Sequence, residues 1–119
     1  MPIQISKLET GVYAIRNTVT GKVYIGSTTQ SFKGRWQGHL NQLRGNRHYN
    51  RHLQATWNKF KEHSFEFEII QRCYPKQCIA CEQKWIDFYH AADRKFGYNG
   101  RPTAESNLEI GRASCRERV

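Results

Sequence analysis

The sequence predicts an α+β fold, in which a small three-stranded antiparallel sheet is flanked by helices in the order β-β-α-α-β-α. Two observations support this prediction. A pair of strand-like segments is joined by a turn of hairpin length, and the later helical and strand patterns do not alternate regularly. Regular alternation would indicate a doubly wound parallel sheet, whereas this order favours helices packed on an antiparallel one. The length of 119 residues is enough for one domain with a modest core.

The first two strands are expected to pair as a hairpin. Residues Gly11 to Asn17 carry β-compatible side chains, Thr18 to Gly21 have the composition of a turn, and Lys22 to Ser27 form the return strand. In the return strand, side-chain alternation places Val23 and Ile25 on one face and the intervening tyrosine on the other. The hairpin is therefore expected to present different side chains to two separate layers.

Two helices follow the hairpin in the prediction. Ser31 can cap a helix that runs to about Arg44, where Gly45 and Asn46 end it. A second helix is expected over about residues 50–62. The side chains expected to face the sheet are Trp36, Leu40 and Leu43 in the first helix and Leu53, Trp57 and Phe60 in the second.

A third strand and a last helix complete the predicted fold. From residue 65 to residue 70, period-two alternation predicts a strand whose apolar face holds Phe65, Phe67 and Ile69. Pro75 suits the first turn of a helix that continues over about residues 76–89. Residues 97–100 have the composition of a turn. The apolar positions of the last helix are Cys78, Ile79, Cys81, Trp85, Ile86 and Phe88.

The charge balance points to a polyanionic partner. Nineteen Lys and Arg stand against ten Asp and Glu, which gives a formal net charge of +9. A domain this basic is attracted to nucleic acid, although basic residues also serve solubility. We find no apolar run long enough for a membrane span or a signal peptide, so we expect an intracellular, cytoplasmic protein without a membrane partner. In that compartment the cysteines are expected to be thiols.

The final residues differ in character from the rest of the chain. Ile110 to Val119 resembles a translated sequencing adapter. We therefore predict a domain over residues 1–108 and a non-native tail over residues 109–119, which we exclude from reasoning about the fold.

Glu82 interrupts the apolar pattern of the last predicted helix. It lies at helical spacing between Ile79 and Ile86 and stands beside Trp85. Burial of a carboxylate is costly unless a metal ion or a cation compensates its charge. The pattern leaves two interpretations open: Glu82 binds such an ion, or it lies at the edge of the apolar row and reaches water.

Other polar and aromatic residues are also candidates for chemistry. Arg35 and His39 are four residues apart, so they share one helix face at a separation of roughly 6 Å, beside the apolar row. His48 lies in the loop before the second helix. On the pattern alone, a solvated polar face is the favoured explanation of Arg35 and His39, and a single histidine in a loop is usually just exposed. Tyr13 and Tyr24 lie on paired strands, where aromatic side chains also serve simply for packing.

Taken together, these residues resemble the motif series of the GIY-YIG nuclease family. The order and spacing look closest to the N-terminal catalytic domain of phage-type homing endonucleases, and the first triplet departs from the pattern by having Val in place of Ile. The resemblance extends over about residues 11–99. The matching positions are Gly11-Val12-Tyr13, Tyr24-Ile25-Gly26, Arg35 with His39, Glu82 and Asn99.

The resemblance implies an endonuclease that hydrolyses DNA with one Mg²⁺ (or Mn²⁺) ion per site. It implies that Glu82 is the metal ligand, that Arg35 binds the scissile phosphate, and that Tyr13 activates or orients the attacking water. A tyrosine has a pKa of about 10, so Tyr13 would need a nearby cation, which the metal or Lys22 could supply. Tyr24, His39 and His48 would position water or phosphate, and Gly11, Gly26 and Asn99 would be structural.

DNA is the expected partner, and a monomer is favoured. The residues predicted to contact DNA are Lys22, Lys33, Arg44, Arg47, His48 and Arg51. Such contacts to phosphate position the nucleic acid without reading its sequence.

Two other functions remain open at this stage. The spacing of Cys73, Cys78 and Cys81 is that of a cysteine-ligated zinc or iron–sulfur module, with Cys115 or His90 as the fourth ligand. Buried thiols explain the same cysteines more simply, because two of them fall in the apolar row of a helix. The second alternative is a nucleic-acid-binding domain that has the fold but no catalytic activity.

Overall fold

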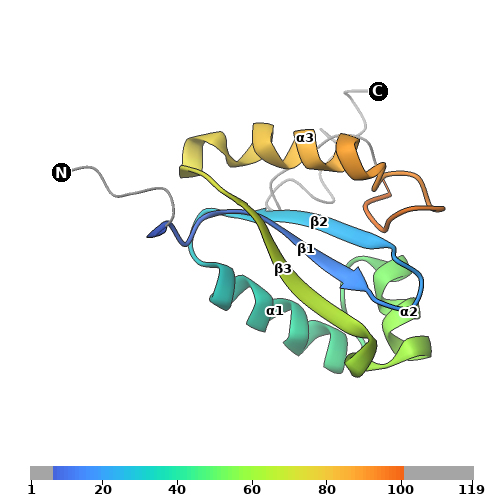
Figure 1. Cartoon of the computed structure of the whole chain (residues 1–119). Coiled ribbons are helices and arrows are strands. Elements are labelled where there is room, and N and C mark those ends of the chain that lie inside the picture. Colours follow the sequence, from blue (N-terminus) through green and yellow to red (C-terminus); the bar gives the residue numbers. More distant parts are fainter. Residues whose placement is uncertain (1–6, 101–119) are drawn as a thin grey trace, which may run out of the picture.

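The computed structural model describes residues 7–100, and they form the predicted α+β arrangement. Three antiparallel strands lie in the order β2-β1-β3, so the first strand of the chain is the central one. Helices α1 and α2 cover one face of this sheet and α3 covers the other (Figure 1). The fold class predicted from the sequence is confirmed. The predicted tail over residues 109–119 lies outside the described residues and stays untested.

The predicted hairpin forms with small shifts of its ends. Strand β1 covers Gly11–Asn17 and β2 covers Val23–Thr28, and their pairing sets Tyr13 opposite Gly26. The Asn17 side-chain oxygen accepts hydrogen bonds from the backbone amides of Val19 and Thr20, which holds the turn between the strands.

Gly11 begins β1 in a conformation that favours glycine. Its φ is +147°, and a Cβ atom at this position would lie 2.1 Å from the carbonyl oxygen of Gln71. The close approach of β3 therefore requires a residue without a side chain here, which agrees with the structural role expected for Gly11.

The helices on the first face have the predicted caps. Helix α1 covers Phe32–Arg44, with the Ser31 hydroxyl accepting from the amide of Gly34. Helix α2 covers Arg51–Phe60 and is capped by the Asn50 side chain. It ends two residues before the predicted end, because Lys61 adopts a positive φ of 73° that interrupts the helical hydrogen bonding.

The remaining elements are displaced slightly from the prediction. Strand β3 covers Phe65–Arg72, and α3 covers Cys78–Tyr89 after a short 3-10 turn over Pro75–Gln77. The segment over residues 97–100 is more than a turn, because Gly97 pairs with Val23 beside β2 and Tyr98 is buried. The carboxyl-terminal segment therefore lies along the outer edge of the hairpin.

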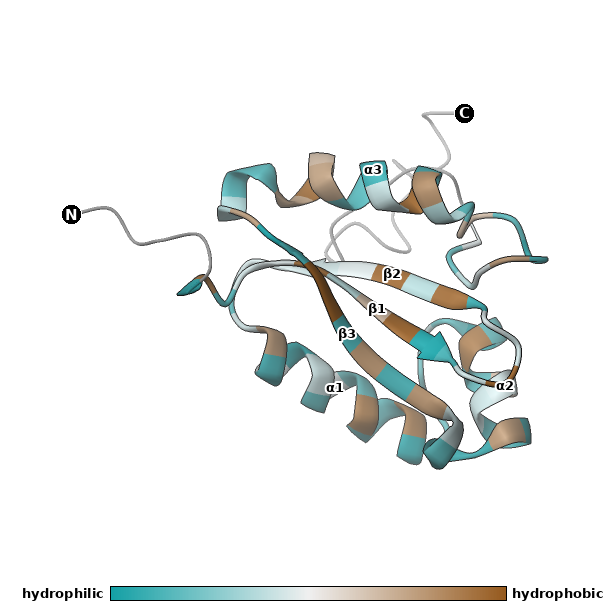
Figure 2. Ribbon diagram, viewed as in Figure 1, coloured by the Kyte–Doolittle hydropathy of each residue, from teal (hydrophilic) through white to brown (hydrophobic). Residues whose placement is uncertain are grey.

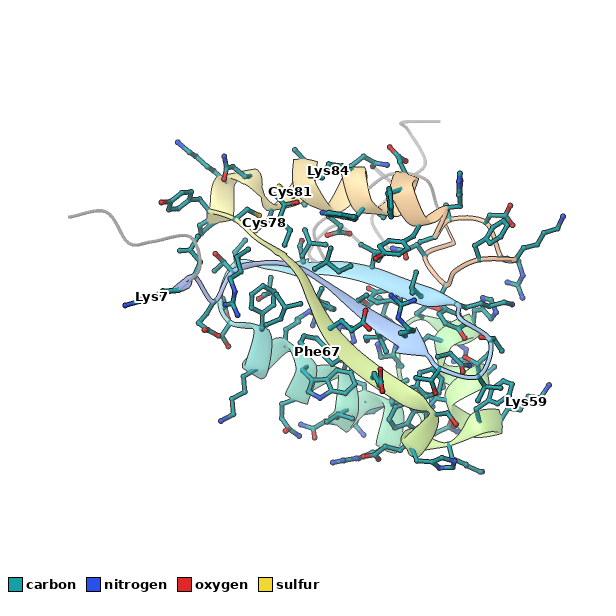
Figure 3. The ribbon with its side chains drawn as sticks, in the orientation of Figure 1. Lys7, Lys59, Phe67, Cys78, Cys81 and Lys84 are labelled. Atoms are coloured by element: carbon teal, nitrogen blue, oxygen red, sulfur yellow. The ribbon has the colours of Figure 1, made fainter. Side chains whose placement is uncertain are left out.

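Two hydrophobic cores lie on opposite faces of the sheet. The core under α1 and α2 contains Tyr13, Ile15 and Tyr24 from the hairpin, and Phe67 extends from β3 toward this layer (Figure 3). The core under α3 contains Val12, Ala14, Val23, Ile25 and Ile86. The strands between the two helical layers carry many apolar residues, which are coloured brown in Figure 2. Each hairpin strand thus contributes alternate residues to the two cores.

Two predicted apolar faces are less regular than the sequence pattern suggested. In β3, Ile69 is 42% exposed because this edge strand is only partly covered by helices. In α3, Ile79 is 46% exposed, and the row that faces the sheet is Cys78, Glu82 and Ile86. Glu82 therefore belongs to the buried face of α3, although one of its predicted apolar neighbours does not.

Candidate active site

The candidate site lies where residues from both faces of the sheet meet at the outer strand β2. Tyr13 and Tyr24 come from the hairpin, Arg35 and His39 from α1, and Glu82 from α3. The Arg35 charge acts on the pKa of both Tyr13 and Glu82, so these side chains share one electrostatic environment. Residues from α1 and α3 therefore influence each other across the hairpin, although these helices cover opposite faces of the sheet.

Glu82 is a buried carboxylate with few protein partners. Ser27, in β2, donates a hydrogen bond to its Oε1 atom at 2.6 Å. Within residues 7–100, the second oxygen, Oε2, accepts no hydrogen bond. Burial raises the pKa of Glu82 to about 7, although Ser27 and the Arg35 guanidinium oppose that shift. Glu82 is 8% exposed, which places the residue on the covered face of α3, and its binding of an ion stays a prediction.

Tyr13 is fully buried and its hydroxyl meets two nitrogen-bearing side chains. Its oxygen lies 2.7 Å from Nε2 of His39. Burial raises the pKa of Tyr13 far above the ordinary value, and Arg35 opposes the shift through its charge and through a hydrogen bond. Arg35 is thus the cation beside Tyr13. Lys22, suggested from the sequence, lies beyond Val23 at the turn end of the hairpin and does not fill that role.

The two histidines lie behind the tyrosines and not on the surface. His39 packs edge-on against the rings of both Tyr13 and Tyr24, and its Nδ1 lies 2.8 Å from Nε2 of His48. His48 is 1% exposed, so the predicted contact of His48 with DNA is wrong for this conformation. The interpretation of His39 as part of a solvated helix face is also wrong, because the residue faces the sheet.

Tyr49 is a component of the site that sequence reasoning missed. Its hydroxyl makes a short hydrogen bond with the hydroxyl of Tyr24, and Nη2 of Arg35 donates to it across 3.5 Å. The Tyr49 ring stacks on His48 and is 38% exposed. A tyrosine in a predicted loop carries no periodic pattern, so nothing in the sequence indicated that it would approach Arg35.

Ser27 was also missed, and in this case a sequence pattern was present. It continues the row of Val23 and Ile25 on one face of β2, which is the face that α3 covers. A polar residue that extends an apolar row toward a buried glutamate would have indicated their contact.

Asn99 has contacts typical of a structural residue. Its side-chain oxygen accepts from the amide of Ile25 at 2.9 Å, and its nitrogen donates to the Ile25 carbonyl at 2.8 Å. These two bonds attach the carboxyl-terminal segment to β2 and hold the outer strand next to Gly26.

The residues predicted to contact DNA lie apart from this buried cluster. Lys33, Arg47 and Arg51 are exposed, and Lys22 is partly exposed. Arg44 is exposed as well, and its guanidinium forms two hydrogen bonds with the carboxylate of Glu62. An exposed ion pair of this kind is weak and can exchange for a phosphate contact.

Gly26 allows Tyr13 to reach the site. A Cβ atom at residue 26 would lie 2.5 Å from the Tyr13 hydroxyl oxygen and 2.6 Å from its Cζ. The tyrosine ring has little freedom to move, because it stacks on Phe67 at 5.1 Å and bonds to His39. The close packing of Tyr13 across β2 thus explains why glycine stands here.

We expect Gly26→Ala to destabilise the domain by about 1–3 kcal/mol, because the added methyl group must displace the Tyr13 ring. Chemical denaturation of the wild-type and variant proteins measures the effect. Gly38→Ala in α1 is the matched control, because a Cβ there meets nothing within 4 Å. The control should be neutral or slightly stabilising, since alanine favours helix. Equal stability of Gly26→Ala and wild type would contradict the packing argument.

Within residues 7–100, the cysteines do not form the alternative metal module. Among residues 7–100, no three His, Cys, Asp or Glu side chains are arranged to hold a metal ion. Cys73 and Cys78 are buried with their sulfur atoms 3.7 Å apart, and burial together with the neighbouring thiols raises the pKa of Cys73 to about 12. His90, one proposed fourth ligand, is exposed at the end of α3, and Cys115 lies outside the described residues. The contacts are those of protonated core thiols.

Comparison with known proteins agrees with this geometry. The family model described as the GIY-YIG catalytic domain matches residues 9–99. Intron-associated endonuclease 1 of Enterobacteria phage T4 is 34% identical over 99 residues, covering 76% of this chain and 40% of that protein. The chain thus spans about two fifths of the length of this curated relative.

No helix within residues 7–100 is long and apolar enough to cross a membrane.

Solved structures show the same similarity. The catalytic domain of intron endonuclease I-TevI, in a glutamate-to-alanine mutant, matches with a TM-score of 0.73 and 29% identity, covering 83% of this chain and all of that one. A second structure of the I-TevI catalytic domain matches with a TM-score of 0.68 and 32% identity, covering 76% of this chain and 96% of that chain. The family predicted from the sequence is confirmed: the chain belongs to the GIY-YIG catalytic domain family, and its relatives are endonucleases.

Proposed function

We propose that this chain is the catalytic domain of a homing-type endonuclease that hydrolyses phosphodiester bonds of DNA with one divalent metal ion. The observation that supports this most strongly is that the Arg35 charge acts on the buried Glu82 carboxylate, although the two residues come from helices on opposite faces of the sheet. A buried carboxylate that shares its surroundings with a partly buried arginine and two buried tyrosines destabilises a fold, and residues with perturbed pKa values of this kind cluster at functional sites.

Glu82 has the properties of a ligand for a hard cation. Magnesium prefers oxygen ligands, keeps several of its waters and needs only one or two protein carboxylates. The free Oε2 atom and the raised pKa of Glu82 fit this demand, because a carboxylate that lacks protein donors gains most from a cation. When bound, Mg²⁺ or Mn²⁺ would supply positive charge beside the phosphate and lower the pKa of a water molecule.

Arg35 is the proposed partner of the scissile phosphate. Its guanidinium is partly buried and is placed between Tyr13 and Tyr49, so its fork of N–H groups is oriented before DNA arrives. Such donors stabilise the negative charge that develops on the phosphate oxygens during displacement.

Tyr13 is the proposed general base or water-orienting group. In the free protein its burial keeps the hydroxyl protonated, so the tyrosine needs neighbouring positive charge to lose its proton. Arg35 supplies one such charge and the bound cation would add another. Tyr24, linked to the partly exposed Tyr49, would hold a water molecule or phosphate oxygen next to it.

The phosphates of the DNA would be bound by basic side chains that lie outside the buried cluster. We assign this role to Lys22, Lys33, Arg44, Arg47 and Arg51, which lie around the hairpin turn, α1 and the start of α2. Charges of this kind bind phosphate in any sequence, so target choice is not encoded by them.

Nicking of a supercoiled plasmid tests the proposal directly. We expect conversion to the open-circular form with Mg²⁺ or Mn²⁺, and no conversion when a chelator replaces the metal. Retardation of the same DNA in a gel, without nicking in either metal, would establish a binding domain that does not cut. Activity that persists unchanged in chelator would contradict the metal-dependent mechanism.

A further inference from the structure

A buried chain of hydrogen bonds runs from the candidate site into the loop before α2. The Tyr13 hydroxyl lies 2.7 Å from Nε2 of His39, and Nδ1 of His39 lies 2.8 Å from Nε2 of His48. Both histidines are almost fully buried. Since a neutral imidazole donates from one nitrogen and accepts at the other, the direction of this chain depends on which nitrogen of each ring holds the proton.

The hydrogen bond at the His48 end of this series fixes the direction of all the others. The backbone amide of Asn50 donates to Nδ1 of His48 across 3.0 Å, and a backbone amide can only donate. His48 Nδ1 therefore has no proton. Burial and the nearby Arg35 charge lower the pKa of His48 to about 4, so the ring is neutral near pH 7 and its single proton is on Nε2.

The position of the His48 ring is itself held by the loop. The backbone amide of His48 donates to the side-chain oxygen of Gln54 at 2.9 Å, and Gln54 donates in turn to the carbonyl of Leu43. The ring also stacks between those of His39 and Tyr49. These contacts leave the loop little freedom to reverse the hydrogen bond from Asn50.

The tautomer of His48 then determines that of His39. Nε2–H of His48 donates to Nδ1 of His39, which therefore has no proton. His39 is kept neutral because burial, Arg35 and His48 all lower its pKa. Its own proton is on Nε2 and points at the Tyr13 oxygen.

We propose that the Asn50 amide and His48 are positioning groups that set the tautomer of His39, so that the Tyr13 oxygen accepts a hydrogen bond from it. Tyr13 then keeps its own O–H directed away from His39, and after loss of that proton its negative oxygen faces two donors, His39 and Arg35. His48 acts through His39 and has no direct contact with substrate. The catalytic consequence rests on the proposed function, whereas the tautomers do not.

Nitrogen NMR of the imidazole rings tests the tautomers in the full chain without DNA. We expect the ¹⁵N shifts and ring-proton couplings of both His39 and His48 to be those of the Nε2–H form near pH 7. A proton on Nδ1 of His39, or a charged His39 ring, would overturn the proposal whether or not the protein cuts DNA.

Substitution of His48 separates hydrogen-bond direction from packing. His48→Gln keeps an N–H donor near the Nε2 position, whereas His48→Met fills similar space without a donor. We expect His48→Gln to keep the His39 tautomer and a single-turnover rate within about fivefold of wild type, and His48→Met to mix the tautomers and slow turnover by about a hundredfold. His63→Met, on an exposed histidine, is the control for the substitution itself.

The outcomes distinguish this inference from the proposed function. Equal loss of turnover in folded His48→Gln and His48→Met would contradict the role in tautomer selection and indicate packing alone. If wild-type protein cuts no DNA, the proposed function fails, and the NMR measurement still decides whether the tautomer assignment holds.

Discussion

Replacement of Glu82 by glutamine is expected to abolish metal-dependent cleavage and, at the same time, to stabilise the metal-free domain above pH 7. Glutamine preserves the shape of the side chain and can still accept a hydrogen bond from Ser27, but it offers no negative charge to a cation. We expect the cleavage rate to fall by at least about a hundredfold, because a group that stabilises charge in the transition state has been removed. Plasmid nicking with Mg²⁺ measures this effect.

The effect on stability follows from the raised pKa of Glu82. The folded state holds the Glu82 proton with a pKa of about 7, against an ordinary value of 4.5 in the unfolded chain. Between these values the folded state binds more protons, so the stability of the wild-type domain falls as pH rises through that window. The fall is on the order of 3 kcal/mol and is complete above the folded pKa.

Glu82→Gln lacks this ionisation and should not show the fall. Urea denaturation at several pH values, with chelator present, compares the two proteins. Added Mg²⁺ should then raise the stability of the wild-type protein and leave that of the variant unchanged. Glu66→Gln is the matched control, because Glu66 is an exposed glutamate in β3. A variant that is less stable than wild type at pH 8, or that still nicks DNA at the wild-type rate, would refute the role assigned to Glu82.

Arg35→Ala is expected to slow single-turnover cleavage by about a hundredfold to a thousandfold at saturating DNA and metal. The variant loses the donors that face the developing charge on the phosphate, and it also removes the cation that opposes the raised pKa of Tyr13. Arg35→Lys should restore only part of the rate, because an ammonium group retains the charge without the fork geometry.

A control for the lost charge is Lys76→Ala, since Lys76 is exposed before α3 and is not part of the proposed site. It should cut at nearly the wild-type rate. If Arg35→Ala binds DNA more weakly but turns over normally at saturation, then Arg35 serves only in binding and the phosphate-stabilising role is incorrect.

Most of the fold could be predicted because its patterns are local. The hairpin turn, the Ser31 cap and the alternation of Val23 and Ile25 depend on residues close together in the chain, and each is present as expected. The errors lie where distant contacts override the pattern. Ile79 is exposed because α3 is oriented with Glu82, and not Ile79, on the face that packs on the sheet. Tyr98 is buried because its segment lies along the edge of β2, which forms only when the chain folds.

Only part of the candidate site could be predicted from the sequence. Tyr13, Arg35 and Glu82 could be identified because they match the motifs of the family. No residue pattern, however, indicated that the cation near Tyr13 would be Arg35 and not Lys22. The burial of His48 could not be predicted from the sequence either, because it depends on the contact with His39 and on the hydrogen bond by which Gln54 holds the loop. Contacts between a loop residue and the helices on either side of it follow no sequence periodicity from which they could be predicted.

The two hydrogen bonds of Asn99 also bear on how the protein behaves at high concentration. An uncovered outer strand is a template on which another polypeptide can add its own strand, and such growth leads to aggregation. In this fold the amide of Asn99 occupies the donor and the acceptor of Ile25, while the amide of Tyr98 occupies the carbonyl of Val23. Residues 97–100 thus cover part of the outer edge of β2. We expect the protein to aggregate more readily when these residues detach from the strand.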